Sequence, residues 1–127
     1  MDVMKTHGAF SWSELMAKDP AKAAEFYGSL FGWKIEEMPM PNGTYRVAKV
    51  GDTPIGGIMS CPDGSMPAMW GVYVTVDDVD AAIAQCTSLG GTVLMPPMEV
   101  PGVGRMAALA DPQGAAFSVI KYVDQPS

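Results

Sequence analysis

The chain has 127 residues, a length typical of one domain, and 48% of them are hydrophobic. Its formal net charge of −6 leaves no basic face for nucleic acid, and no apolar run approaches the length of a membrane span. Two distant cysteines and the lack of a secretory signal lead us to expect reduced thiols in a cytoplasmic protein. The single histidine, His7, restricts imidazole-based metal sites and catalysis.

The first half of the chain begins with a strand predicted at Gly8–Leu15, where aromatic and small residues alternate. Asp19 followed by Pro20 is typical of a helix start, and Gly32 is typical of a helix end. Between them, apolar residues recur at helical spacing and predict one apolar stripe: Ala23, Phe26, Tyr27, Leu30 and Phe31. Short strands are predicted next, at Trp33–Met38, Tyr45–Val50 and Pro54–Ser60.

The second half repeats this order. A strand is predicted at Trp70–Val76, and a helix follows that begins after Asp77 or Asp78 and ends at Gly90. The apolar stripe of this helix consists of Val79, Ala82, Ile83, Cys86 and Leu89. The remaining strands are predicted near Thr92–Met95, Arg105–Ala110 and Ala115–Tyr122.

The two halves are copies of one module. Each half places a glycine 13 residues after a helix-capping aspartate, and an arginine six residues before another aspartate. These pairs are Asp19–Gly32, Asp77–Gly90, Arg46–Asp52 and Arg105–Asp111. The offset of about 58 residues predicts β-α-β-β-β modules at residues 8–60 and 69–122 within one domain covering 1–127. We expect an α+β fold whose curved mixed sheet surrounds a cleft.

Several strings of residues resemble the vicinal oxygen chelate superfamily, which includes glyoxalase I, bleomycin-resistance proteins and extradiol dioxygenases. The strings are Gly8-x-Phe10-x-Trp12-x-Glu14-Leu15, Asp19-x6-Phe26-Tyr27-x3-Phe31-Gly32-Trp33, Val74-x-Val76-Asp77-Asp78 and Asp111-Pro112-x-Gly114. The resemblance runs from Gly8 to Tyr122 and implies a glyoxalase-like fold. Fold alone does not determine the chemistry.

Enzymes of this superfamily hold a divalent metal through His, Glu or Gln side chains on the first and last strands of each module. The resemblance places the equivalent positions at Trp12, at Trp70 or Gly71, at Ser118, and at Ile58 or Met59. These residue types do not suit a catalytic metal, and Glu14 supplies only one carboxylate nearby. We therefore expect no cofactor. The alternative functions are a metal-dependent lyase or dioxygenase of the same superfamily, or a metal-free isomerase.

The residues expected to bind a small molecule in the cleft are aromatic or polar: Phe10, Trp12, Glu14, Tyr45, Trp70, Tyr73, Arg105 and Ser118. The two arginines, Arg46 and Arg105, either clamp an anionic ligand or form surface pairs with Asp52, Asp111 or their neighbours. No catalytic residue is identified, because nothing pairs Glu14, Tyr45 or Tyr73 with a partner. The Gly56-Gly57 pair is interpreted as a turn or bulge.

Together these observations predict a glyoxalase/bleomycin-resistance-like protein that binds a small molecule without a metal, as a homodimer. We expect neither a nucleic acid nor a membrane as a partner. The acidic charge favours a cationic ligand. A protein that only dimerises, with its cleft filled by side chains, is the third interpretation.

Overall fold

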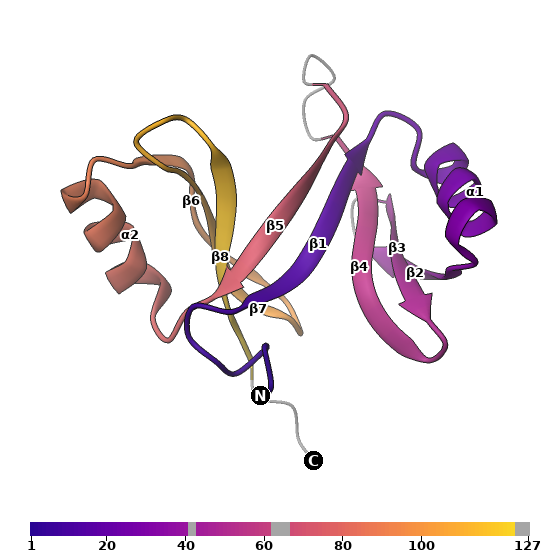
Figure 1. Cartoon of the computed structure of the whole chain (residues 1–127), viewed down its shortest axis with the longest axis horizontal. Coiled ribbons are helices and arrows are strands. Elements are labelled where there is room, and N and C mark those ends of the chain that lie inside the picture. The colour runs from indigo at the N-terminus through magenta and orange to yellow at the C-terminus, as the bar shows by residue number, and fades with distance from the viewer. Residues whose placement is uncertain (41–42, 62–66, 124–127) are drawn as a thin grey trace. The chain divides into compact units, whose positions relative to one another are not determined.

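The computed structural model describes residues 1–40, 43–61 and 67–123. Within these residues, two helices and eight strands follow one another in the order β-α-β-β-β, twice, as the internal repeat predicts (Figure 1). Contacts divide the chain into a module-one unit, residues 12–71, and a module-two unit, residues 1–11 and 72–127. The fold class is therefore α+β, with duplicated βαβββ modules. Neither helix in the described part of the chain is long and apolar enough to cross a membrane.

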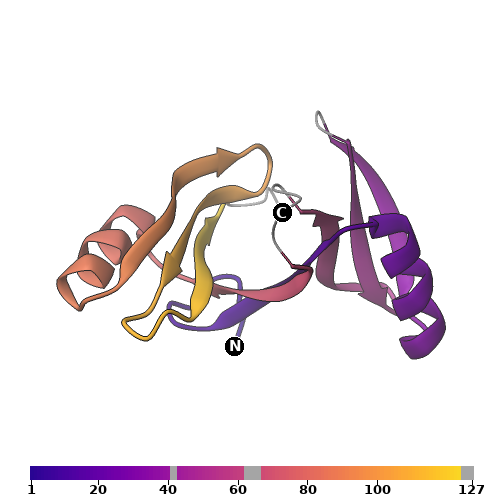
Figure 2. The ribbon, with the colours of Figure 1, turned by 90° about the horizontal axis from the view of Figure 1, so that it is seen from above.

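The elements of the first module are β1 (Phe10–Ala17), α1 (Pro20–Phe31), β2 (Lys34–Met40), β3 (Gly43–Val50) and β4 (Thr53–Ser60). Their strands are ordered β2-β3-β4-β1. The pairs β2–β3 and β3–β4 are antiparallel, whereas β1 and β4 are parallel, so the sheet is mixed. Helix α1 lies against one face of these strands (Figure 2).

Helix α1 has the ends that the sequence predicts. The Asp19 carboxylate accepts the backbone N–H of Lys22 at 3.1 Å and caps the first turn, with Pro20 in the position where no N–H is needed. At the other end, Gly32 takes the left-handed conformation, with φ of 75°, and donates its N–H to the Gly28 carbonyl. Residues at or next to each end of α1 therefore determine where the helix begins and where it ends.

The apolar stripe predicted for α1 is split between the core and the surface. Ala24 is buried against the sheet, and Ala23 and Tyr27 pack beside it on the cluster of Leu15, Ala17 and Ile58. By contrast, Phe26, Leu30 and Phe31 are about 60% exposed. A stripe of five residues covers a wider arc of the helix than the one line of contact that the sheet offers, so its outer edge stays uncovered.

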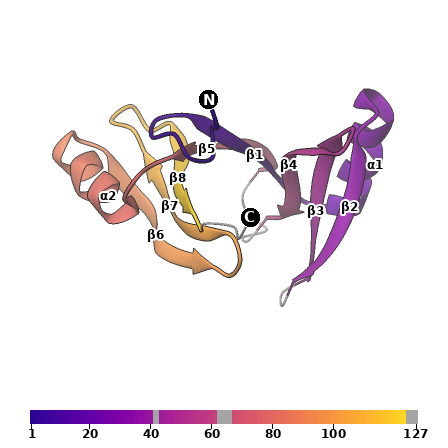
Figure 3. The ribbon, with the colours of Figure 1, turned by 90° about the horizontal axis from the view of Figure 1, so that it is seen from below.

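The elements of the second module are β5 (Met69–Thr75), α2 (Val79–Ser88), β6 (Thr92–Val100), β7 (Gly104–Ala110) and β8 (Ala116–Tyr122). Their order is β5-β8-β7-β6, with β5 and β8 parallel and the other pairs antiparallel. Helix α2 packs on one face of this sheet, over a core of Val76, Val79, Ala107, Leu109 and Val119 (Figure 3).

In the second module the structure settles one point that the sequence left open, the N-cap of α2, and corrects another, the end of β6. Of the two candidate caps, Asp78 is the one whose carboxylate accepts a helix N–H, that of Ala81, at 3.1 Å. Strand β6 continues to Val100, although the sequence predicted an end at Met95, before two prolines. The prolines are tolerated because β6 is the outermost strand of its sheet order and because its pairing with β7 is interrupted by irregularities at this point.

Candidate functional site

The face of the module-one sheet opposite α1 carries three of the predicted site residues. Side chains alternate along β1, and Leu15 and Ala17 pack toward α1. Trp12 and Glu14 therefore point to the opposite face, where Tyr45 of β3 joins them.

A chain of hydrogen bonds links these three side chains. The indole Nε1 of Trp12 donates to the Tyr45 hydroxyl oxygen at 2.9 Å, and that hydroxyl donates to Glu14 Oε2 at 2.7 Å. Glu14 is only 8% exposed, whereas Trp12 and Tyr45 are half-buried. A hydrogen bond to a carboxylate is among the stronger side-chain bonds, so the three groups hold one another in a defined arrangement.

Gly57 makes this arrangement possible, and its role was missed in the sequence. Strand β4 lies between β1 and β3, and Gly57 pairs with Glu14 in the register. A Cβ at Gly57 would overlap the hydroxyl oxygen and Cζ of Tyr45 and would lie 2.9 Å from its Cε1. The missing side chain is the space through which Tyr45 reaches Glu14. Of the two interpretations of Gly56-Gly57, the turn is wrong, because both glycines lie inside β4. The bulge agrees with a register shift between β3 and β4 directly beside Gly56.

The donor set on this face does not fit a divalent metal. Trp12 occupies the position where the superfamily resemblance implies a ligand, and Glu14 supplies one carboxylate that is already bonded to Tyr45. Among the described residues, no three His, Cys, Asp or Glu side chains are grouped as a metal site would require. What the face does offer is an indole, a phenol and an oriented carboxylate. Such groups can stack on a planar ligand and accept hydrogen bonds from it.

The face of the module-two sheet opposite α2 carries two more of the predicted site residues. Tyr73 of β5 and Ser118 of β8 are partners in the parallel register, so they lie side by side on one face. The Tyr73 hydroxyl is 3.8 Å from the sulfur of Met106, which belongs to the same face of β7. This face is therefore also a mixture of aromatic, thioether and hydroxyl groups.

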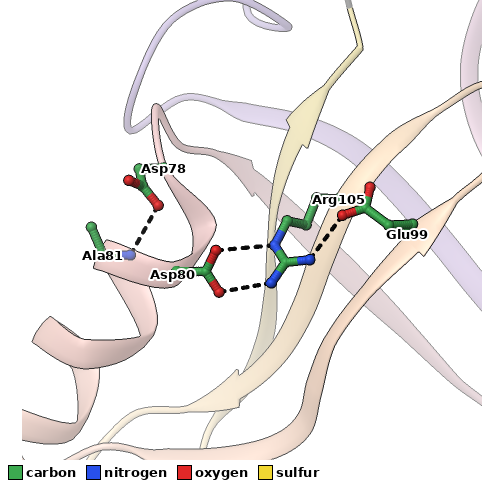
Figure 4. Close-up of polar contacts among 5 residues, drawn as sticks. All are labelled: Asp78, Asp80, Ala81, Glu99 and Arg105. Atoms are coloured by element: carbon green, nitrogen blue, oxygen red, sulfur yellow. Dashed lines mark hydrogen bonds and ion pairs between the residues drawn. The ribbon is translucent and has the colours of Figure 1, made fainter.

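Arg105 lies on the α2 side of the module-two sheet, away from Tyr73 and Ser118. It bonds the carboxylate of Asp80 through two nitrogens, at 2.8 and 3.1 Å, and that of Glu99 at 2.8 Å (Figure 4). The hydrogen bonds from Arg105 lower the pKa of Asp80, and those to Asp80 and Glu99 raise the pKa of Arg105. The expectation that Arg105 binds a ligand together with Tyr73 needs a correction, because the two side chains face opposite ways.

The surface pairs predicted for the two arginines exist, but with other partners than those named. Asp111 does not pair with Arg105, because its carboxylate accepts the N–H groups of Gln113 and Ala115 in the turn after β7. Arg46 lies 3.6 Å from Glu37, its neighbour on β2, and not beside Asp52. Cross-strand neighbours, Glu37 for Arg46 and Glu99 for Arg105, replace the sequence neighbours, and Asp80 of α2 is a further partner of Arg105.

The other two predicted residues, Trp70 and Phe10, take no part in the hydrogen bonds that join Trp12, Tyr45 and Glu14. Trp70 donates its indole N–H to the Tyr27 hydroxyl at 3.2 Å and so contacts α1, on the other side of the sheet. Phe10 belongs to the module-two unit and is 70% exposed. His7 accepts the backbone N–H of Asp77 at 3.0 Å and attaches the N-terminal segment to the start of α2.

Two grooves lie on the helix sides of the units. One, of about 400 Å³, runs between α1 and the strands β2 and β3 and includes Glu25, Glu37 and Arg46. The other, of about 340 Å³, lies beside α2 and includes His7 and Asp77. Neither groove includes a residue of the Trp12–Tyr45–Glu14 chain.

Residues 13–120 match the sequence profile of a family described as the glyoxalase-like domain. "Putative glyoxylase CFP32" of Mycobacterium tuberculosis is 43% identical over 119 residues, which cover 93% of this chain and 46% of that protein. "Anthracycline biosynthesis protein DnrV" of Streptomyces peucetius is 41% identical over 127 residues, covering 88% and 46%. The chain thus spans about half the length of these relatives.

Among solved structures, methylmalonyl-CoA epimerase of Streptomyces coelicolor is similar, with a TM-score of 0.71. The match covers 94% of this chain and 100% of that one, at 16% sequence identity. At this identity the likeness concerns the fold alone.

Proposed function

Because the chain belongs to the glyoxalase-like domain family, we propose that it binds a small molecule on the face of the module-one sheet opposite α1. The observation that carries the proposal is the hydrogen-bonded chain from Trp12 through Tyr45 to Glu14. Its indole and phenol offer aromatic surface, and its carboxylate can accept a hydrogen bond from a donor on the ligand. The three groups are ordered by one another, so little freedom is lost when a ligand binds.

The chemistry of these groups favours a planar ligand that carries a positive charge. An indole attracts a cation over its face, and Glu14 supplies a negative charge in a place that is nearly closed to water. The net charge of −6 would also attract a cation from a distance. One relative is named an anthracycline biosynthesis protein, and an anthracycline with a protonated amino sugar has this combination of a planar ring system and a charge.

Calorimetric titration with such an anthracycline, and with its N-acetylated form, tests the proposal. Glu14→Gln should weaken binding of the protonated form about 10- to 100-fold, the loss of a hydrogen bond to a charged group, and should change binding of the acetylated form little. Trp12→Ala should weaken both forms. Trp70→Phe is the matched control, because Trp70 lies on the α1 side of the sheet.

Two results would count against this site. One is equal binding by wild type, Trp12→Ala and Glu14→Gln. The other is a thermal-shift screen of planar aromatic cations in which no compound stabilises the protein at millimolar concentration.

A second candidate function is metal-free isomerisation, which the pair of Glu14 and Tyr45 favours. A carboxylate at 2.7 Å from a phenol places a base and an acid side by side, as proton transfer next to a carbonyl requires. The test is exchange of α-hydrogens of hydroxy- and oxo-carbonyl compounds in D₂O, followed by NMR. Exchange that survives chelator treatment and is lost in Glu14→Gln would support it. Activity that the chelator abolishes would point instead to a metal-dependent lyase or dioxygenase.

We propose that the protein acts without a divalent metal, as a cytoplasmic homodimer. The support for the first part is the donor chemistry at Trp12 and Glu14. Elemental analysis of the purified protein tests it, and a stoichiometric transition metal that a chelator removes would contradict it.

A further inference from the structure

The exposed edge of α1 forms an aromatic surface together with two tryptophans from neighbouring segments. We define this aromatic surface as Phe26, Tyr27, Leu30, Phe31, Trp33 and Trp70, all in the module-one unit. Its chemistry is unusual for the outside of a protein, where large apolar side chains are normally scattered singly.

The rings hold one another in place around Tyr27. The Tyr27 ring lies 5.0 Å from that of Phe26, 5.8 Å from that of Trp33 and 5.3 Å from that of Trp70, measured between centroids. The Trp70 indole also donates a hydrogen bond to the Tyr27 hydroxyl. Edge-to-face and stacked contacts of this kind are favourable, so the aromatic surface is ordered before any partner arrives.

Its exposed part has the area of an interaction site. Phe26 is 60% exposed, Leu30 59%, Phe31 58% and Trp70 41%. With about 200 Å² for each such side chain, the exposed part comes to roughly 400 Å². The largest apolar patches of monomeric proteins reach about 300–600 Å² and are often functional. An average interface buries about 800 Å² on each partner, so the aromatic surface would supply about half of one.

The aromatic surface carries no charge along α1, which favours contact with the same surface of a second copy of the chain. No residue from Phe26 to Trp33 is charged, whereas the chain as a whole has a net charge of −6. Two copies carry the same net charge and therefore repel each other as a whole, and a neutral apolar surface is a place where they can meet without bringing like charges together. A twofold interface brings the same surface of both copies together, so one neutral surface is sufficient.

We propose that the aromatic surface packs against the same surface of a second copy of this chain and is the interface of a homodimer. Leu30 and Phe26, which lie four residues apart on one line of α1, meet their counterparts there. The proposal is independent of the proposed ligand site, because Trp12, Tyr45 and Glu14 lie on the other face of the module-one sheet.

Sedimentation equilibrium of the purified full chain from 1 to 100 µM tests the proposal. Wild type should be dimeric at the upper end of the range. Leu30→Lys should raise the dimer dissociation constant about thirtyfold or more, as for a residue central to an interface. Leu94→Lys is the matched control, since Leu94 is 55% exposed on β6, in the other unit, and its dissociation constant should stay that of wild type.

A second measurement needs no substitution and so does not depend on a variant that folds. Hydroxyl-radical footprinting of wild type should show Phe26 and Phe31 protected from oxidation as the concentration rises, while Phe10, 70% exposed in the other unit, keeps its reactivity. A monomer throughout the range would overturn the proposal. So would a dimer in which Phe26 and Phe31 stay reactive, or one that Leu30→Lys leaves as tight as the control.

Discussion

Gly57→Ala should destabilise the protein although alanine is compatible with the backbone there. Gly57 is a strand residue without a positive φ, so the substitution acts through space alone. The added methyl would overlap the Tyr45 ring and hydroxyl, which forces Tyr45 out of its position. Its hydrogen bonds to Trp12 and Glu14, at 2.9 and 2.7 Å, would then be lost.

The expected loss of stability follows from the overlap with Tyr45 and from the lost hydrogen bonds. Overfilling a packed site costs about 1–3 kcal/mol, and a lost hydrogen bond to a charged group costs about 1.5–3 kcal/mol. Rotation of the half-buried Tyr45 relieves part of the overlap, so we expect a loss of about 3 kcal/mol in the free energy of unfolding. For 127 residues this lowers the melting temperature by about 10 °C.

Urea unfolding of a double-mutant cycle measures the effect and tests its cause. In a Tyr45→Ala background, Gly57→Ala should cost little, because the side chain that it displaces is gone. Gly28→Ala, inside α1, is the control. Its Cβ would lie 3.5 Å from the nearest atom, the Trp33 carbonyl oxygen, so it should stabilise the helix by about 0.5–1 kcal/mol. The reasoning is refuted if Gly57→Ala costs as much without Tyr45 as with it.

Two further predictions concern α2 and its surroundings. Asp78→Ala should lower the free energy of unfolding by about 1 kcal/mol, because it removes the N-cap of α2, whereas Asp77→Ala should lower it clearly less. Equal losses for the two variants in urea unfolding would refute the assignment of the cap. Arg105 lowers the pKa of Asp80 in the folded protein. Their pairing therefore stabilises the fold above the unfolded-state pKa of Asp80, about 4, and this stabilisation is lost as the pH falls through the lower pKa of the folded state. Asp80→Asn should therefore make the stability less dependent on pH between 4 and 2, and an unchanged dependence would contradict this.

Much of the fold could be predicted from the sequence because its signals are local. A capping aspartate, a first-turn proline and a glycine in the left-handed conformation act within a few residues of the helix end that they set. The aspartate and the glycine recur at the same spacing in the second half, and this recurrence revealed the duplication. The prolines of β6 misled the prediction for the opposite reason, since a proline is tolerated or not according to whether its strand is at a sheet edge.

The candidate site was only partly predictable, because it depends on which face each side chain takes. Trp12, Glu14 and Tyr45 were named from the sequence, but nothing in their spacing paired them, and the pairing arises from the strand order and from the space left by Gly57. Arg105 was named as a candidate ligand-binding residue because it has an equivalent in the repeat, with a surface ion pair as the alternative. A shift of one residue along a strand reverses the face, and an internal repeat does not resolve that difference.

The sequence by itself determined the duplicated βαβββ order, the ends of α1 and the residue types available for chemistry, since these depend on local propensity and on composition. Only the tertiary structure decided that Tyr45 bonds Glu14, that Arg105 bonds Asp80 and Glu99, and that one edge of α1 stays exposed. The physical reason is that strand register and helix packing decide which residues meet, whether they lie 31 positions apart, as Glu14 and Tyr45 do, or six, as Glu99 and Arg105 do. Which apolar residues are buried depends on the surface that meets them as well as on their own hydrophobicity.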